Sequence, residues 1–218
     1  MKRSLLAIAL ILISRLMMAQ DIPSMTPPVF KDRIVKLQFF SPLTGNLTFG
    51  YEQALIKSIT LTGEAGIIGA SLVHLDAHQK GFLMKAGAKF YFSPDYYLDG
   101  MKRYNDFQGA YFNPVLVYSG FGFDYYDNNG KKQRGTNNSF GLLLHLGKQW
   151  VISNVIALEL YGGIGYGYSW VSANEYSYSA GNVTDLSEIQ PYKFSHIQPS
   201  NDVPIAFDAG FNIGILLK

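Results

Sequence analysis

The sequence predicts an all-β fold, an eight-stranded antiparallel up-and-down transmembrane β-barrel in the outer membrane of a Gram-negative bacterium. Three observations lead to this fold class. Long runs alternate bulky apolar residues with small or polar ones, the chain has 22 Gly, 15 Tyr and 15 Phe but no Cys, and its first residues are typical of an export signal. We therefore expect export, followed by insertion into lipid as strands.

The composition limits the classes of protein that the chain can belong to. With 218 residues, of which 48% are hydrophobic and 16% charged, it is expected to fold as one ordinary domain. A net charge of +2 without runs of Lys and Arg argues against nucleic acid as a partner. Because there is no Cys, a lipoprotein anchor and a thiolate metal site are excluded, and we expect no cofactor.

The N-terminal residues predict a signal peptide over 1–19. Lys2 and Arg3 form a basic start, residues 5–13 form an apolar run, and Ala19 offers a small residue at the cleavage point. The apolar run is too short to span a bilayer as a helix. The protein is therefore expected to be exported, with cleavage after Ala19.

The segment 20–32 contains three prolines, which cannot donate to a β-ladder, so it is expected to be an extended periplasmic leader. From residue 33 onward the apolar period becomes two, which predicts a barrel over 33–218. In the fifth strand, Pro114 weakens the expected pairing. The eight predicted strands are, in order, 35–39, 47–52, 59–67, 82–92, 110–121, 140–147, 156–170 and 205–218.

The last three predicted strands carry the clearest signal. Runs of eleven or more residues alternate there almost without a break. A tilted strand needs about 9–11 residues to cross a membrane, whereas strands of soluble proteins average about five or six. Strand length therefore favours a membrane barrel over a soluble sandwich.

The face opposite the bulky apolar residues combines Gly and Ala with isolated charges. Because an eight-stranded barrel is only wide enough to be filled by its own side chains, we expect this face to line the lumen. Positive and negative charges nearly balance there, so we expect ion pairs that make the interior a closed polar plug. The predicted lumen network consists of Lys36, Glu52, Glu64, Lys85, Lys89, His145, Glu159 and Asp208.

Aromatic residues near the ends of the apolar faces predict girdles at the two membrane interfaces. The predicted girdle residues are Phe90, Tyr118, Trp150, Tyr166, Tyr168 and Trp170.

The spacing of the strands predicts short periplasmic turns at 56–58 and 152–155. Longer outward loops are expected at 69–80, 124–138 and 172–203. The link at 93–108 departs from this rule, because it is long but falls on the periplasmic side.

Four stretches resemble the characteristic blocks of an uncharacterised family of small outer-membrane barrels, a domain of unknown function. They are 36–46 (KLQFFSPLTGN), 50–55 (GYEQAL), 87–92 (GAKFYF) and 109–114 (GAYFNP). The resemblance covers roughly residues 33–218. Such proteins are similar in build to the OmpA-like transmembrane domain, so the resemblance implies an eight-stranded barrel with no established reaction.

Two motifs fit a structural role better than a chemical one. The glycine-rich stretch 162–167 superficially resembles a phosphate-binding loop, but the alternation runs through it without a following helix, so lumen-facing glycines are expected. His74 and His78 have the spacing of helical zinc ligands, yet they lie in a polar stretch without helical periodicity. We expect them to be surface loop residues.

His145 raises the possibility of a lipid hydrolase, because it shares a face with acidic residues and a Ser could complete a hydrolytic group. The reacting groups of such an enzyme must meet the acyl substrate at the lipid surface. Since His145 is expected to point into the lumen, a structural histidine bonded to a lumen carboxylate is favoured.

The sequence therefore favours a non-enzymatic outer-membrane barrel with a structural or surface-binding role through its extracellular loops, chiefly 172–203. The alternatives are a narrow pore for small solutes, an outer-membrane lipid hydrolase and a soluble secreted barrel. The expected partners are outer-membrane lipid and, during biogenesis, the barrel assembly machinery. We expect a monomer, and the sequence does not identify a surface ligand.

Overall fold

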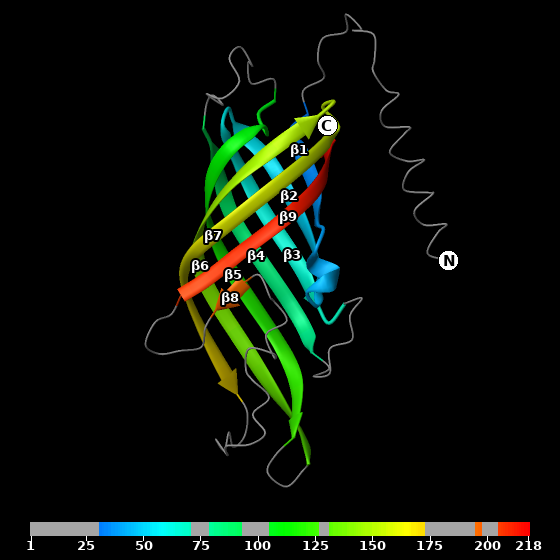
Figure 1. Ribbon diagram of the computed structural model, residues 1–218, viewed down its shortest axis with the longest axis vertical. Coiled ribbons are helices and arrows are strands. Elements are labelled where there is room, and N and C mark those ends of the chain that lie inside the picture. Colours follow the sequence, from blue (N-terminus) through cyan, green and yellow to red (C-terminus); the bar gives the residue numbers. More distant parts are fainter. Residues whose placement is uncertain (1–30, 71–78, 93–104, 127–130, 173–194, 198–204) are drawn as a thin grey trace, which may run out of the picture. The chain divides into compact units, whose positions relative to one another are not determined.

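The computed structural model describes residues 31–70, 79–92, 105–126, 131–172, 195–197 and 205–218. The predicted signal peptide lies outside the described residues. Nine strands and one short 3₁₀ helix make up the described part (Figure 1). They are β1 (Arg33–Gln38), η1 (Ser41–Leu43), β2 (Asn46–Ile56), β3 (Ile59–Ile68), β4 (Lys80–Tyr91), β5 (Gly109–Tyr126), β6 (Lys132–Ile152), β7 (Ile156–Ser172), β8 (Ser195–Ile197) and β9 (Ile205–Leu217).

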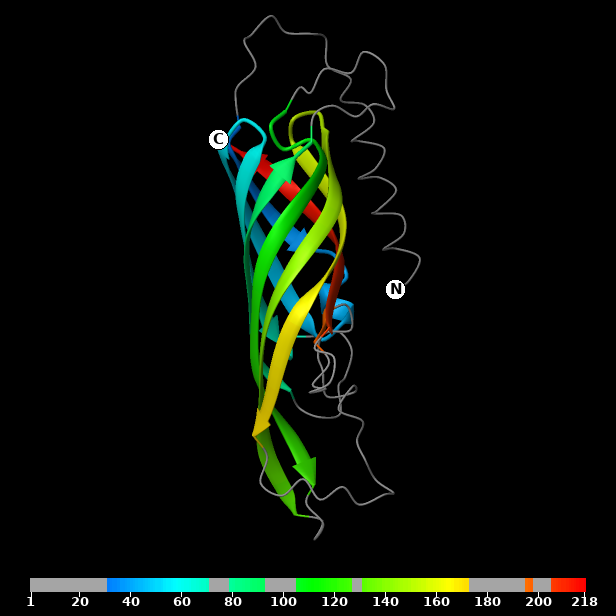
Figure 2. The ribbon, with the colours of Figure 1, turned by 90° about the vertical axis from the view of Figure 1, so that its left-hand side faces the viewer.

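Eight of these strands close into a ring. Strands β1 to β7 pair antiparallel in sequence order, β7 pairs with β9, and β9 pairs with β1 (Figures 1 and 2). The short β8 pairs with the N-terminal part of β9 and is not a member of the ring. The predicted all-β, eight-stranded, up-and-down antiparallel barrel is confirmed. In the described residues, no helix is both long and apolar enough to cross a membrane.

The register determines the size of the interior. Val35 of β1 pairs with Ile215 of β9, and the line of paired residues that starts at Val35 returns to β9 at Ile205 after one circuit. The ring therefore closes with a stagger of ten residues, from Ile215 to Ile205. A barrel of eight tilted strands has an interior that its own side chains can fill. The residues on the line between Val35 and Ile205 are Tyr51, Gly63, Ala86, Leu116, Leu142 and Tyr166.

Tight turns join the strands at the end of the barrel where β1 begins and β9 ends. In the turn between β6 and β7, Ser153 and Asn154 have φ angles of 51° and 54°, and the Val155 amide donates to the Ile152 carbonyl oxygen at 3.0 Å. Two positive φ angles in succession define a type I′ turn, whose twist matches that of the flanking strands. The β2–β3 turn also contains a positive φ, 74° at Ser58. Both turns lie where short connections were predicted.

The outward connection predicted at 124–138 is wrong over most of its length. β5 continues to Tyr126 and β6 begins at Lys132, and the two strands remain paired up to Tyr126 and Lys132 (Figure 2). The Asn, Gly and Gln residues of this stretch are typical of turns, but here two strands satisfy each other's backbone groups beyond the rim of the ring. The result is a long hairpin of 18 and 21 residues that projects from the end opposite the tight turns.

Pro114 affects one ladder, as expected. β4 and β5 are paired from Lys80↔Gly122 to Gly87↔Val115 and again at Phe90↔Phe112, with an interruption between these points. On its other side Pro114 lies opposite Leu144 of β6. A proline can donate to neither neighbour, so it weakens one ladder while the ring stays closed.

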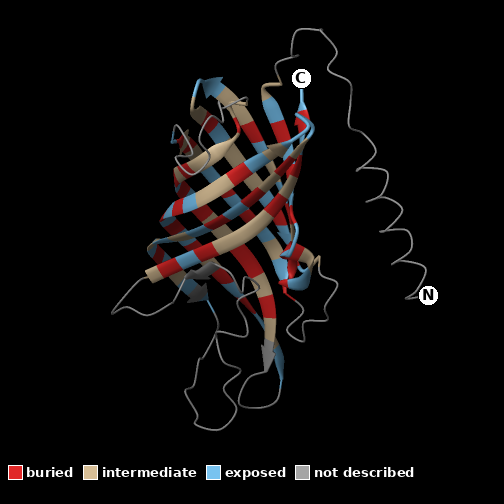
Figure 3. Cartoon of the chain, turned by 45° about the horizontal axis from the view of Figure 1, so that its top comes forward, coloured by how far each residue is buried: buried red, intermediate tan, exposed pale blue. Residues whose placement is uncertain are grey.

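Burial alternates along the strands (Figure 3). The inward side chains are buried inside the barrel, whereas the outward ones are mostly large, apolar and exposed. The core of the protein therefore lies in the lumen. Glycines of β7 on the inward face make this possible, because a Cβ on Gly163 would lie 2.3 Å from His145 Cδ2 and one on Gly165 would lie 2.0 Å from the Leu142 carbonyl oxygen.

We predict that Gly163→Ala lowers the free energy of unfolding by about 1–3 kcal/mol, because the added methyl group would overpack the lumen against His145. The matched control is Gly162→Ala on the outward face, where a Cβ would have no heavy atom within 4 Å. Urea unfolding from lipid vesicles, followed by tryptophan fluorescence, measures both variants. Equal stability of the two would contradict the packing described here.

Candidate functional site

The centre of the lumen holds four charged side chains from four strands. Lys36 of β1 pairs with Glu52 of β2, and its Nζ lies 2.7 Å from Glu159 Oε2 of β7. Lys89 of β4 pairs with Glu159, and its Nζ lies 3.0 Å from Glu52 Oε2. Each lysine thus contacts both carboxylates, and all four side chains are at least 95% buried. Two positive and two negative charges cancel in this cluster, which we call the inner quartet.

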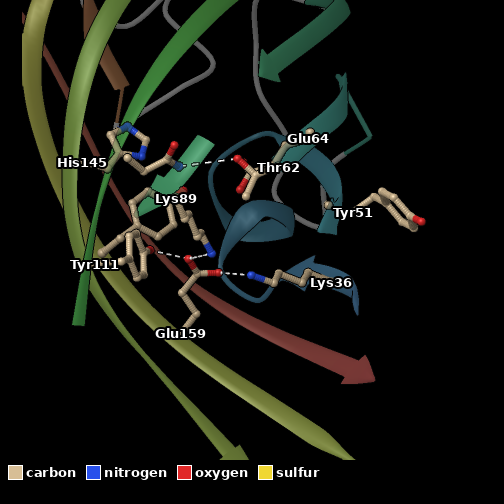
Figure 4. A pocket seen from close by; sticks show the side chains of 12 residues that line it. Lys36, Tyr51, Thr62, Glu64, Lys89, Tyr111, His145 and Glu159 are labelled. Carbon is tan, nitrogen blue, oxygen red and sulfur yellow. Dashed lines mark hydrogen bonds and ion pairs between the residues drawn. The ribbon is translucent and has the colours of Figure 1, made fainter. Parts of the chain in front are cut away.

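Neutral side chains occupy the remaining positions around the inner quartet. Tyr91 Oη and Thr60 Oγ1 donate to Glu52 Oε1 at 2.8 and 2.5 Å, and the Tyr111 hydroxyl donates to Glu159 (Figure 4). Gln149 Oε1 accepts from Lys36 and Lys89 at 2.7 and 3.1 Å. Buried charges are tolerated only when paired and hydrogen-bonded, and these donors and acceptors meet that requirement.

A second group of charges lies beside the quartet. Lys85 of β4 pairs with Asp208 of β9, and its Nζ lies 3.6 Å from Glu64 Oε2 of β3. His145 Nε2 of β6 lies 3.3 Å from Asp208 Oδ2, and the imidazole stacks on the ring of Tyr161 at a centroid distance of 4.9 Å. This group consists of Lys85, Glu64, Asp208 and His145. We call these four residues the outer group.

The structure therefore brings all eight predicted lumen residues together, in two adjacent groups. Sequence reasoning missed the neutral members, although alternation could have found them. Tyr91 has the same strand parity as Lys85 and Lys89, and Gln149 has that of His145. The other neutral residues in contact with the quartet are Thr60, Tyr111 and Asn212, whose Nδ2 donates to Glu159 Oε2 at 3.1 Å.

The prediction that the whole interior is a polar plug is wrong. Apolar side chains fill the lumen on both sides of the charged groups. The larger apolar layer lies toward the projecting hairpin, where inward positions of five strands are apolar. Its residues are Ile68, Leu83, Val115, Val117, Phe121, Phe123, Leu143 and Ala206.

The smaller apolar layer seals the end with the tight turns. Its centre is Phe107, which follows the undescribed part of the long link and is completely buried. Phe107 packs with Ile34 of β1, Ala157 of β7 and Leu216 of β9. Asn105 fixes the backbone just before Phe107, because its Oδ1 accepts a hydrogen bond from the Phe107 amide at 2.9 Å. The long link predicted at 93–108 thus has a structural role at its C-terminal end.

A small cavity remains between the two charged groups, lined in part by Lys36, Thr62, Glu64 and His145 (Figure 4). The centre of a water molecule can occupy about 20 Å³ of it, which is room for one or two waters. Tyr51 borders it only through its backbone position, since the ring points away from the lumen. Among the described residues, no group of three or more His, Asp or Glu side chains is arranged to hold a metal ion.

The predicted girdle residues all lie on the outward face. Trp150 is exposed near the end with the tight turns, and Tyr166, Tyr168 and Trp170 follow one another along β7 toward the opposite end. Phe90 stacks on Phe112 at 4.7 Å, and Tyr118 packs on Phe82 at 5.6 Å, so these two are half-buried against neighbouring strands. The residues His74 and His78 and most of the predicted 172–203 loop lie outside the described residues.

We predict that Glu159→Gln lowers the free energy of unfolding by about 3–5 kcal/mol, because it leaves Lys36 and Lys89 with one carboxylate between them in a buried site. The double variant Lys89→Gln/Glu159→Gln removes one charge of each sign and is expected to lose less than the sum of the two single variants. Urea unfolding from lipid vesicles measures all three. Strict additivity would show that the charges do not depend on each other.

Comparison with known proteins identifies the family of the chain. A solved structure, the N-terminal β-barrel domain of Pseudomonas aeruginosa OprF, is similar with 10% identity and a TM-score of 0.39, over 86% of this chain and 98% of that chain. A search of curated proteins gave no match. The family described as "Protein of unknown function (DUF3575)" matches residues 6–194. The chain therefore belongs to the DUF3575 family, whose function is unknown.

Proposed function

We propose that the protein is a non-enzymatic outer-membrane barrel with a closed lumen, which anchors a projecting hairpin and its neighbouring segments at the cell surface. The observation that carries the proposal is a belt of exposed apolar side chains on all eight strands of the ring. In water such a continuous apolar surface would far exceed the few hundred Å² that soluble monomers expose. The belt includes Val35, Phe49, Leu61, Met84, Leu116, Leu146, Leu160 and Ile215.

The arrangement of the connections supports an orientation. The tight turns and the paired ends Arg33 and Leu217 lie at one end, and the hairpin of β5 and β6 projects from the other. Membrane barrels of this kind have short periplasmic turns and longer extracellular connections. The end with the tight turns is then periplasmic, and the hairpin faces outward. Outer-membrane lipid and the barrel assembly machinery are the partners of such a protein, which we propose to be monomeric.

The packing of the lumen favours a structural role over the alternative of a pore. An apolar layer, the two charged groups and the Phe107 plug follow one another along the described interior. The cavity between them has room for only one or two waters. A lipid hydrolase receives as little support, because His145 is 4% exposed and faces Asp208 inside the barrel rather than the lipid.

We predict that Leu146→Arg, in the middle of the belt, lowers the free energy of unfolding from lipid vesicles by about 2–4 kcal/mol, because a charge would face hydrocarbon. The matched control is Thr136→Arg, an exposed position on the same face of β6 beyond the belt. An exposed Leu→Arg change costs little in a protein surrounded by water. Equal stability of the two variants would therefore contradict the proposed membrane placement.

We predict that the purified protein shows no steady single-channel conductance in planar bilayers, since the lumen is filled. Heat-dependent gel mobility on the same sample verifies that the barrel is folded. Regular conductance steps from folded protein would favour the narrow pore instead.

A further inference from the structure

Two basic residues, Lys80 and Arg134, lie on the outward face where β4, β5 and β6 leave the belt. Lys80 of β4 pairs in register with Gly122 of β5. A Cβ on Gly122 would lie 3.2 Å from Arg134 Nε and 3.3 Å from Arg134 Nη2, so the guanidinium of this β6 residue lies over the glycine. The Arg134 guanidinium therefore occupies the space that a side chain at Gly122 would fill, and Lys80 belongs to the strand on the other side of this glycine.

Both cations are available for a ligand. Lys80 and Arg134 are exposed, and neither has a hydrogen bond or ion pair within the described part of the chain. The neighbouring Lys132 differs, because its Nζ lies 2.9 Å from Asp124 Oδ2. Asp124 pairs in register with Arg134, but its carboxylate contacts Lys132. An anion that contacts both Lys80 and Arg134 would be stabilised by both charges.

The pair lies at the depth where the outward surface changes from apolar to polar. Phe82, two residues along β4 from Lys80, packs on Tyr118 of β5. The Tyr118 hydroxyl is directed to Asn138 of β6 and donates to its Oδ1 at 3.1 Å. Aromatic rings with a polar group at one edge are typical of the membrane interface. A ligand at Lys80 and Arg134 would thus have apolar surface directly below it.

We propose that Lys80 and Arg134 bind the phosphate group of a lipid in the outward-facing leaflet. The guanidinium of arginine can form a bidentate pair of hydrogen bonds with two phosphate oxygens, and lysine adds a point charge. Because Gly122 has no side chain, the Arg134 guanidinium can lie over the backbone of β5, on the side of the strand where Lys80 of β4 pairs. The acyl chains of the same lipid would lie against Phe82 and Tyr118. This inference rests on the proposed membrane placement and names a lipid class that the barrel selects.

The test measures binding of lipid A, a phosphorylated glycolipid, to the purified full-length protein in detergent by native mass spectrometry. Lys80→Gln/Arg134→Gln is expected to weaken binding about tenfold or more, because charge-assisted hydrogen bonds are lost. The matched control is Lys57→Gln, which removes an exposed positive charge from the β2–β3 turn at the opposite end. It is expected to leave lipid A binding unchanged.

Three outcomes would overturn the proposal. These are equal loss in Lys57→Gln, equal binding of dephosphorylated lipid A by the unaltered protein, or complete displacement of lipid A by the same concentration of inorganic phosphate. The last result would assign the site to free phosphate. Insertion of each variant into phosphatidylcholine vesicles, read by heat-dependent gel mobility, separates the two proposals. Failure of the unaltered protein to insert contradicts membrane placement, whereas normal insertion without lipid A binding contradicts only the phosphate site.

Discussion

The pairing of β1 with β9 is the constraint on which the rest of the structure depends. Once the first and last strands meet with a stagger of ten residues, the number of strands and their tilt determine the volume of the lumen. Every inward side chain must then fit that volume. Glycines on β7 make room for His145, and long lysines from β1 and β4 reach across to carboxylates on other strands. The charged groups are thus a consequence of closure, and they in turn connect strands that are not neighbours.

The order of layers explains how a barrel with an apolar outer face can hold buried charges. The inner quartet is neutral as a whole and has tyrosine, threonine and amide partners. Apolar layers separate it from both ends of the barrel. Inside the barrel, breaking one ion pair would leave a charge unpaired in a medium of low polarity. We therefore interpret the inner quartet as a set of ion pairs that favours one arrangement of the strands. This structural role agrees with the proposed anchor and involves no transport of solutes.

The fold could be predicted because the alternation of inward and outward side chains follows from the pleat of a strand. Every strand of the ring shows this two-residue period. Alternation also placed Lys36, Glu52 and Glu159 on one face. It did not reveal the apolar layers, because β5 and β6 carry apolar residues on both faces, such as Val115 beside Leu116. The end of the hairpin was missed since local turn composition was outweighed by pairing between two strands. The burial of Phe107 depends on contacts with the first and the last strand, which no local sequence pattern contains.

The Phe107 plug also has a consequence for folding. Its partners Ile34 and Leu216 come from the first and the last strand, so the ring must close before the plug has a complete binding site. Conversely, a ring closed without Phe107 would enclose an unfilled space at the end with the tight turns. The pairing of β1 with β9 and the burial of Phe107 therefore stabilise each other. A barrel whose first and last strands are unpaired therefore lacks a complete binding site for Phe107.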